Sequence, residues 1–195
     1  MKRLVCAFAV LFLSLAARAE NPKVLFLTNL GSFTIELYPD KAPTTVAAFL
    51  KYVQDGFYDE TIFHRVLPRF VIQGGGFTPD LKPKHASKTL PNEANNGLMN
   101  VLGAVAMARD PWDPASATTQ FFINLDDNKF LNFHKPERDY YGYCVFGKVI
   151  SGMDVVKKIS ESPLVHNNRP FESMPEMAAV VQKATLLSPV AQATP

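Results

Sequence analysis

Short runs that alternate between apolar and polar residues recur along this chain, and only two stretches follow the period of a helix. Ser32–Tyr38 alternates strictly, and with Lys23–Leu30 on the other side of Gly31 it predicts an antiparallel hairpin. Further short runs of this kind are Ile62–Leu67, Phe70–Gln73, Val101–Met107, Gln120–Leu125, Cys144–Ile150 and Ala178–Leu187. Many short strands with few helices favour a mainly β fold, either an antiparallel barrel or a sandwich.

Two segments carry the apolar stripe of an amphipathic helix. In the first, Val46, Phe49, Leu50 and Val53 recur at helical spacing. Pro43 suits its first turn, Gly56 suits its end, and we expect Thr44 or Thr45 to cap it. The second helix is predicted at Met153–Ser160, and its expected buried residues are Val155, Val156 and Ile159.

The first twenty residues have the layout of a secretory signal peptide. A basic start at Lys2 and Arg3 precedes an apolar run, Leu4–Leu15, and then small residues suited to signal peptidase. The run is too short for a permanent transmembrane helix. The alternative to a signal peptide is a buried N-terminal helix. We therefore expect a signal peptide at 1–19, one domain at 20–187, a loose tail at 188–195, and a soluble protein in the periplasm.

Cleavage changes the charge and the cysteine content. It removes three basic residues and no acidic one, so the formal net charge goes from +2 to −1. A near-neutral chain gives no reason to expect a nucleic-acid partner. Of the two cysteines only Cys144 remains, among aromatic and aliphatic neighbours, and we expect a buried thiol rather than a reactive one. No spacing typical of a metal site is present, and no cofactor is expected.

Two segments place polar residues inside apolar runs. Arg65 lies in a dense aromatic and aliphatic stretch, where a permanent charge needs a partner or a function; a salt bridge or an extended surface arginine is the alternative. In the second segment, Gln120, Phe122 and Asn124 share one face of a predicted strand. That face is typical of a wall that receives a substrate, although a polar outer face with one exposed phenylalanine fits it equally.

The order of the motifs resembles the cyclophilin family. The segment from Phe63-His64-Arg65-Val66 to Phe70-Val71-Ile72-Gln73-Gly74-Gly75 is similar to the family signature. Gly103 to Ala108, Thr119 to Ile123 and Val145 to Val149 resemble further family motifs in the same order. The resemblance spans about Lys23 to Leu187. It implies a closed eight-stranded antiparallel β-barrel capped by two helices and the activity of a peptidyl-prolyl cis/trans isomerase.

The resemblance also implies a site. Its catalytic residues would be Arg65, Gln73 and Phe122. Its substrate-binding residues would be Phe70, Val71, Ala108, Gln120, Phe130, Leu131 and Tyr143. His64, the neighbour of Arg65, would be structural and point to the other face of the strand.

The chain departs from the family pattern at several of these positions. Val71 replaces a methionine, and Phe130 replaces a tryptophan that helps to hold cyclosporin, so we expect weak cyclosporin binding. Arg109 stands where many members have asparagine, in a contact made by the backbone. Tyr143 takes the place of a histidine after a longer loop, Asn132–Gly142, which resembles the bacterial secreted branch.

Peptide-bond rotation needs no nucleophile, metal or cofactor, because no bond is made or broken. We expect Arg65 to stabilise the twisted amide and Gln73 to orient the guanidinium of Arg65. The expected substrates are proline-containing segments of exported proteins. A monomer without membrane partners after cleavage is predicted. Two competing hypotheses are a cyclophilin fold that binds proline segments without catalysis, and a lipocalin-like barrel around a small apolar ligand.

Overall fold

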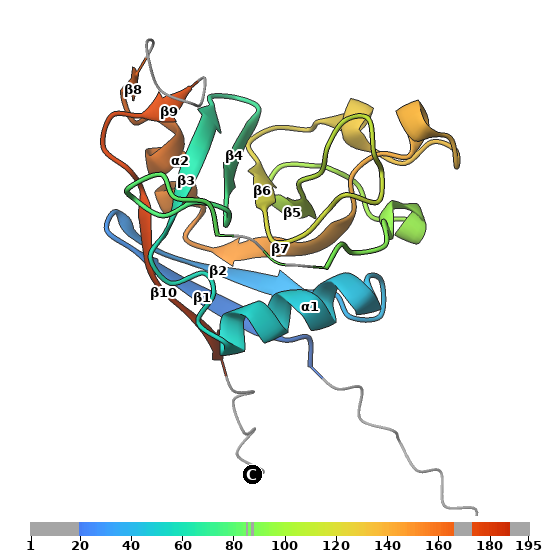
Figure 1. Ribbon diagram of the computed structural model, residues 1–195, viewed down its shortest axis with the longest axis horizontal. Coiled ribbons are helices and arrows are strands. Elements are labelled where there is room, and N and C mark those ends of the chain that lie inside the picture. Colours follow the sequence, from blue (N-terminus) through green and yellow to red (C-terminus); the bar gives the residue numbers. More distant parts are fainter. Residues whose placement is uncertain (1–19, 85, 87, 166–172, 188–195) are drawn as a thin grey trace, which may run out of the picture.

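The computed structural model describes residues 20–84, 86, 88–165 and 173–187 of the chain. The signal peptide and the tail predicted at 188–195 lie outside these residues. Eight strands form a closed barrel in the order β1-β10-β3-β4-β6-β5-β7-β2, and every paired neighbour is antiparallel (Figure 1). The barrel with two helices confirms the fold predicted from the sequence.

The barrel strands agree with the alternating runs of the sequence within a few residues. They are β1 (Lys23–Thr28), β2 (Gly31–Leu37), β3 (Thr61–Leu67), β4 (Val71–Gly74), β5 (Ala104–Met107), β6 (Phe121–Asn124), β7 (Val145–Ser151) and β10 (Val180–Leu187). A separate two-stranded sheet, β8 (Leu164–Val165) with β9 (Met174–Pro175), was not predicted. Its strands of two residues are too short to produce a readable alternation.

The two helices are α1 (Pro43–Gln54) and α2 (Met153–Ser160), on different sides of the barrel (Figure 1). In α2, Val156 and Ile159 are buried as predicted, whereas Val155 is only partly buried. The loops that the structure describes contain three 3-10 turns: η1 (Ala94–Asn96), η2 (Lys129–Leu131) and η3 (Arg138–Tyr140). No helix in the part of the chain described here is long and apolar enough to cross a membrane.

The predicted threonine cap of α1 is wrong. The N-cap residue is Ala42, and no side chain of the helix itself caps it. Glu93, far along the chain, accepts hydrogen bonds from the backbone N–H of Thr44 at 3.1 Å and of Thr45 at 2.8 Å. It also accepts one from the Thr45 hydroxyl at 2.7 Å. A carboxylate favours the positive end of the helix dipole, and a partner this distant cannot be read from local sequence.

Aromatic side chains fill the inside of the barrel. Phe49 of α1 packs against Phe26, Tyr58, Phe121 and Phe146, with ring centroids 4.9–6.2 Å apart. Cys144 joins this core, and burial raises its thiol pKa to about 11, which confirms the expected buried cysteine. Because the interior is packed, a ligand has to bind on the outside of the barrel wall.

A second, smaller apolar cluster lies on that outer side. Its buried members are Val71, Ala104, Ala106, Phe122 and Val145, from strands β4, β5, β6 and β7. In β6, Phe121 belongs to the inner core and the next residue, Phe122, belongs to this outer cluster, as strand alternation requires. The outer face of the β4-β6-β5 sheet is therefore apolar and able to form the floor of a site.

Candidate functional site

Three residues predicted to be catalytic lie side by side across three neighbouring strands. Arg65 of β3 pairs with Gln73 of β4, and Gln73 pairs with Phe122 of β6. The register of β3 shifts between Phe63 and Arg65, which marks a β-bulge. Without the bulge, strict alternation would put Arg65 on the same face as Phe63, which belongs to the core. The bulge thus turns the arginine to the outer face.

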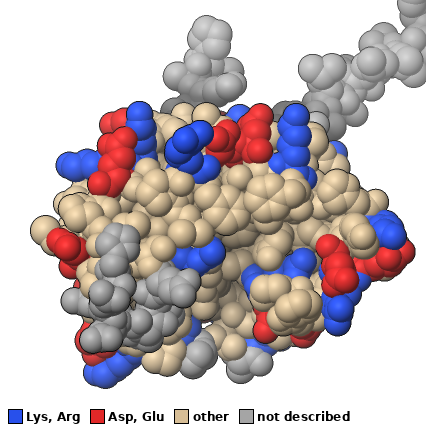
Figure 2. Space-filling model, turned by 90° about the horizontal axis from the view of Figure 1, so that it is seen from above, with Lys and Arg blue, Asp and Glu red and all other residues tan. Residues whose placement is uncertain are grey.

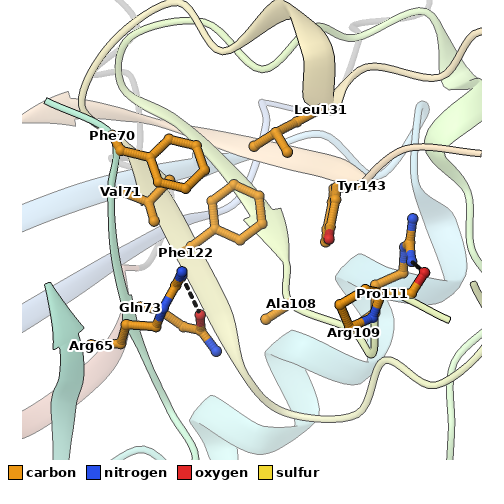
Figure 3. A pocket seen from close by; sticks show the side chains of 10 residues that line it. All are labelled: Arg65, Phe70, Val71, Gln73, Ala108, Arg109, Pro111, Phe122, Leu131 and Tyr143. Atoms are coloured by element: carbon orange, nitrogen blue, oxygen red, sulfur yellow. Dashed lines mark hydrogen bonds between the residues drawn. The ribbon is translucent and has the colours of Figure 1, made fainter. Parts of the chain in front are cut away.

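This row borders a cleft of about 350 Å³ on the outer wall of the barrel (Figure 3). The volume is within the usual range for binding pockets. The residues that line the cleft are Arg65, Phe70, Val71, Gln73, Ala108, Arg109, Pro111, Phe122, Leu131 and Tyr143. Phe122 and Tyr143 meet edge to face, with ring centroids 5.6 Å apart. The cleft therefore combines an aromatic and aliphatic wall with polar groups, among them the guanidinium of Arg65 at one edge.

Gln73 connects Arg65 to a second glutamine. The Nη1 atom of Arg65 donates a long hydrogen bond, 3.4 Å, to Oε1 of Gln73. The Nε2 atom of Gln73 donates to Oε1 of Gln120 at 2.9 Å. Gln120, predicted to hold the peptide, does not line the cleft and instead fixes the amide of Gln73. Gln73 is thus placed to orient the guanidinium.

The charge of Arg65 faces no acidic partner in the described part of the chain. No ion pair of Arg65 is found among the residues that the structure describes, so the predicted alternative of a salt bridge does not hold there. The cleft lining holds two arginines and no carboxylate. Seen from above, the molecule is hollowed near its centre, and basic side chains border the hollow (Figure 2). The site therefore offers a positive donor to whatever enters it.

His64 lies away from the cleft, as predicted. Its ring is buried and contacts Phe77, with centroids 4.7 Å apart. The pKa of His64 is lowered to about 4, chiefly by burial, which disfavours the imidazolium, and in smaller part by the nearby charge of Arg65. The imidazole is neutral at physiological pH and adds no second charge beside Arg65.

Arg109 contributes through its side chain, which sequence reasoning missed. Its Nε atom donates to the carbonyl of Gly142 at 3.0 Å, and Nη1 donates to the carbonyls of Asp110 and Pro111 at 2.8 and 3.1 Å. The guanidinium lies over the ring of Tyr143, 4.3 Å from its centroid. It therefore joins two loops at the edge of the cleft. The sequence feature that could have indicated this role is the position of Arg109 directly after the motif that ends at Ala108.

The prediction that Gln120, Phe122 and Asn124 form one wall holds only for Phe122. Asn124 is fully buried, and its Nδ2 atom donates to Oδ1 of Asn100 and to the carbonyl of Ala104. Its side chain faces other polar groups behind the cleft, and a single strand's alternation could not reveal these partners.

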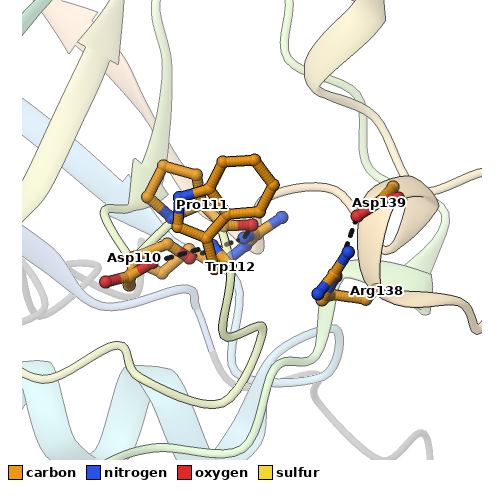
Figure 4. Close-up of polar contacts among 6 residues, drawn as sticks. Asp110, Pro111, Trp112, Arg138 and Asp139 are labelled. Atoms are coloured by element: carbon orange, nitrogen blue, oxygen red, sulfur yellow. Dashed lines mark hydrogen bonds and ion pairs between the residues drawn. The ribbon is translucent and has the colours of Figure 1, made fainter.

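Phe130 lies beside the cleft and does not line it. Its ring is 70% exposed and stacks on Phe70, with centroids 5.6 Å apart. The long loop, Asn132–Gly142, also approaches the segment after Arg109. There Arg138, bonded to Asp139, lies 5.5 Å from the ring centroid of Trp112 (Figure 4). Exposed aromatic rings thus flank the cleft on two sides.

No cluster of histidine, cysteine or acidic residues suited to a metal ion occurs among the residues placed by the structure. The site brings together Arg65, Gln73 and Phe122 with five of the seven predicted substrate-binding residues. Those five are Phe70, Val71, Ala108, Leu131 and Tyr143. What the arrangement can do is grip a small apolar ring and present a fixed cation to a polar atom beside it.

Comparison with known proteins gives one consistent family. The protein-family model described as cyclophilin type peptidyl-prolyl cis-trans isomerase/CLD matches residues 23–181. Peptidyl-prolyl cis-trans isomerase B of Escherichia coli is 55% identical over 136 residues, which are 70% of this chain and 82% of that protein. Peptidyl-prolyl cis-trans isomerase A of Dickeya dadantii is 42% identical over 193 residues, 96% of this chain and 99% of that protein.

A solved structure has the same fold. The crystal structure of a cyclophilin type isomerase of Cryptosporidium parvum superimposes with a TM-score of 0.71 at 23% sequence identity. It covers 87% of this chain, and the match spans 99% of the Cryptosporidium chain.

Proposed function

The chain belongs to the cyclophilin-type peptidyl-prolyl cis-trans isomerases, and on this premise we propose how its cleft catalyses the reaction and where the enzyme acts. The substrates of the family are proline-containing peptides. We assign the cleft around Arg65, Gln73 and Phe122 as the place where the X-Pro bond is turned. The observation that carries this proposal is a guanidinium with no acidic partner among the described residues, at the edge of a cleft whose aromatic and aliphatic wall suits a small ring.

The chemistry sets a simple demand on the site. Resonance in the amide makes rotation slow, with a barrier of about 18–20 kcal/mol. Halfway through the rotation the nitrogen lone pair is no longer conjugated, and it becomes a hydrogen-bond acceptor. A catalyst has to bind this twisted form more tightly than either planar form.

Arg65 meets that demand. Its guanidinium is always protonated and is a rigid donor fork. Gln73, held by Gln120, keeps the fork in place, while Phe70, Phe122 and Leu131 hold the proline ring. Because apolar walls keep water away, the hydrogen bond to the twisted nitrogen is stronger than it would be in bulk solvent. The site residues act through position and charge alone.

Catalysis in the cleft has a direct test with a matched control. Phe122→Ala removes the ring at the centre of the wall, and Ile150→Ala truncates a side chain that is 47% exposed on β7. We expect the wild-type chain and Ile150→Ala to accelerate exchange of an Ala-Pro peptide and the proline-limited refolding of a model protein. Phe122→Ala should lose most of this acceleration. If Phe122→Ala folds and is as fast as the wild type, the cleft is not the site.

The place of action is a second part of the proposal. Residues 1–19 have the layout of a secretory signal, so we propose that the enzyme assists the folding of exported proteins in the periplasm. Cell fractionation of the full chain and of a chain lacking residues 1–19 tests this. The full chain should appear in the periplasm in cleaved form, and the shortened chain in the cytoplasm. Full chain retained uncleaved in the cytoplasm would refute the proposal.

Weak cyclosporin binding and a monomeric state complete the proposed function. Phe130 stacks on Phe70 at the edge of the cleft with its ring mostly in solvent. Phe130→Trp provides a larger surface there and should increase inhibition by cyclosporin, while the basal rate changes little. Sedimentation analysis should give one species with the mass of a single chain. Strong inhibition of the wild type, or a dimer at micromolar concentration, would contradict these two expectations.

A further inference from the structure

Four asparagine side chains are buried together behind the cleft. They are Asn100, Asn124, Asn128 and Asn132, none more than 8% exposed. Asn124 is the last residue of β6, and Asn128 and Asn132 stand just before and just after η2. Buried amides are costly unless their polar atoms are hydrogen-bonded. Their arrangement therefore has to be explained by the bonds they make.

The side chains form a directional chain. Nδ2 of Asn128 donates to Oδ1 of Asn124 at 2.8 Å, and Nδ2 of Asn124 donates to Oδ1 of Asn100 at 3.2 Å. Oδ1 of Asn132 then accepts from Asn100, at 2.7 Å from its backbone N–H and at 3.4 Å from Nδ2. Each amide thus fixes the orientation of the next.

Two members of this chain, Asn128 and Asn100, reach the backbone of the cleft. Asn128 donates through Nδ2 to the carbonyl of Phe70 at 3.0 Å. Nδ2 of Asn100 donates to the carbonyl of Leu131 at 3.1 Å and lies 3.4 Å from that of Tyr143. Phe70, Leu131 and Tyr143 all line the cleft, and none of the four asparagines does.

These three cleft residues need such support because they lie outside the barrel strands. Phe70 is in the turn between β3 and β4, Leu131 is in η2, and Tyr143 lies between the long loop and β7. Backbone hydrogen bonds hold them in part: the carbonyl of Phe70 accepts from the N–H of Leu125 at 2.8 Å, and that of Leu131 accepts from the N–H of Tyr143 at 2.9 Å. The asparagines add a second hydrogen bond to each of these two carbonyls and so restrain the spacing of the walls further.

We propose that the four asparagines are positioning residues that set the spacing of the proline-ring pocket by holding the backbone of Phe70, Leu131 and Tyr143. This inference rests on the proposed function, because it takes the cleft as the substrate site. The ring is held in the planar and the twisted states alike. Loosening the walls should therefore raise KM and leave kcat nearly unchanged.

Two variants test opposite ends of the chain. Asn128→Ala removes the bond to the Phe70 carbonyl, and Asn132→Ala removes the acceptor that orients Asn100. Each should raise KM for an Ala-Pro peptide about three- to tenfold, the effect of one net hydrogen bond, with kcat within twofold of the wild type. The dissociation constant measured by titration should rise by the same factor.

Asn29→Ala is the matched control. The side chain of Asn29 also makes two bonds to backbone, to the carbonyl of Ala178 at 3.1 Å and from the N–H of Val180 at 2.9 Å, away from the cleft. It should change neither KM nor kcat. A purely structural role of Asn128 and Asn132 would reduce the folded fraction, which lowers apparent kcat and leaves KM unchanged. That pattern, or folded variants with wild-type KM, would overturn the proposal.

A measurement on the wild-type chain decides the matter if the variants do not fold. NMR should show the side-chain amide signals of the four asparagines shifting when the Ala-Pro peptide saturates the cleft, and that of Asn29 staying in place. Four signals that move no more than that of Asn29 would overturn the proposal. A wild-type chain that binds the peptide without turning it over would refute the proposed function instead, while peptide affinity would still test the asparagine chain.

Discussion

Glu93 lies outside the cleft and caps α1 from almost fifty residues away in the sequence. Its carboxylate holds the first turn of α1 through the backbone N–H groups of Thr44 and Thr45 and the hydroxyl of Thr45, at 3.1, 2.8 and 2.7 Å. Thr45 is buried, so water cannot replace the carboxylate easily. We predict that Glu93→Ala destabilises the fold and that Glu93→Gln does so by less.

The size of the effect follows from the contacts. Loss of a helix cap costs about 0.5–2 kcal/mol, and a buried group left without its partner adds about 1–3 kcal/mol. Because the three bonds share one side chain, these costs are not additive, and we expect about 2–3 kcal/mol for Glu93→Ala. Gln keeps one acceptor oxygen and loses the charge that favours the helix N-terminus, so about 1 kcal/mol is expected for Glu93→Gln.

Urea denaturation followed by circular dichroism measures this difference. With a slope of about 2 kcal/mol per molar urea, Glu93→Ala should lower the midpoint by about 1–1.5 M. Glu161→Ala is the control, because Glu161 is exposed and makes only a long ion pair of 3.9 Å with Lys157. It should shift the midpoint very little. Equal urea midpoints for Glu93→Ala and Glu161→Ala would refute the claim that Glu93 stabilises the fold by capping α1.

Three further predictions concern the edge of the cleft, its loop and the pH dependence of stability. Arg109→Leu should lower kcat/KM about three- to tenfold, because it releases Tyr143 and several loop carbonyls. Arg109→Lys should not restore the rate, since an ammonium group cannot form the same fork of hydrogen bonds. Unchanged peptide kinetics in both variants would contradict this role of Arg109. In thermal melts, Gly142→Ala should destabilise the fold more than Gly97→Ala. Both glycines have positive φ, but a Cβ at Gly142 would lie 2.5 Å from backbone, whereas Gly97 has nothing within 4 Å. Equal decreases in melting temperature would exclude the clash at Gly142. His64 has a pKa of about 4 in the folded chain, so the unfolded chain binds the extra proton first as pH falls. About 3 kcal/mol of stability is therefore present above pH 6.5 and is lost as pH falls towards 4. His64→Gln should flatten this part of the stability profile, and an equally steep profile in that variant would contradict the assignment.

The sequence predicted those features of the fold that depend on local periodicity. The hairpin of β1 and β2 and the helix at Met153–Ser160 follow directly from apolar spacing, and the structure confirms both. Features that depend on distant partners were not predictable. Glu93 caps α1 from almost fifty residues away, and only the fold brings it there.

Some residues of the site were likewise predictable from the sequence, and others were not. Resemblance to the family pointed to Arg65, Gln73 and Phe122, and the register of three strands brings them into one row. Alternation alone would have turned Arg65 into the core, because the β-bulge after Phe63 leaves no trace in an apolar pattern. Asn124 was wrongly predicted to face the cleft, because the groups that bind its buried side chain come from other segments of the chain.

The most direct test of the proposed mechanism is NMR exchange on an Ala-Pro peptide, comparing the wild type with Arg65→Ala. Arg69→Ala is the matched control, because Arg69 is an exposed arginine in the turn that follows β3 and does not line the cleft. If Arg65 stabilises the twisted amide, kcat should fall about a hundredfold or more in Arg65→Ala. KM should change little, and Arg69→Ala should match the wild type. A folded Arg65→Ala chain that exchanges the peptide as fast as the wild type would contradict the role of Arg65.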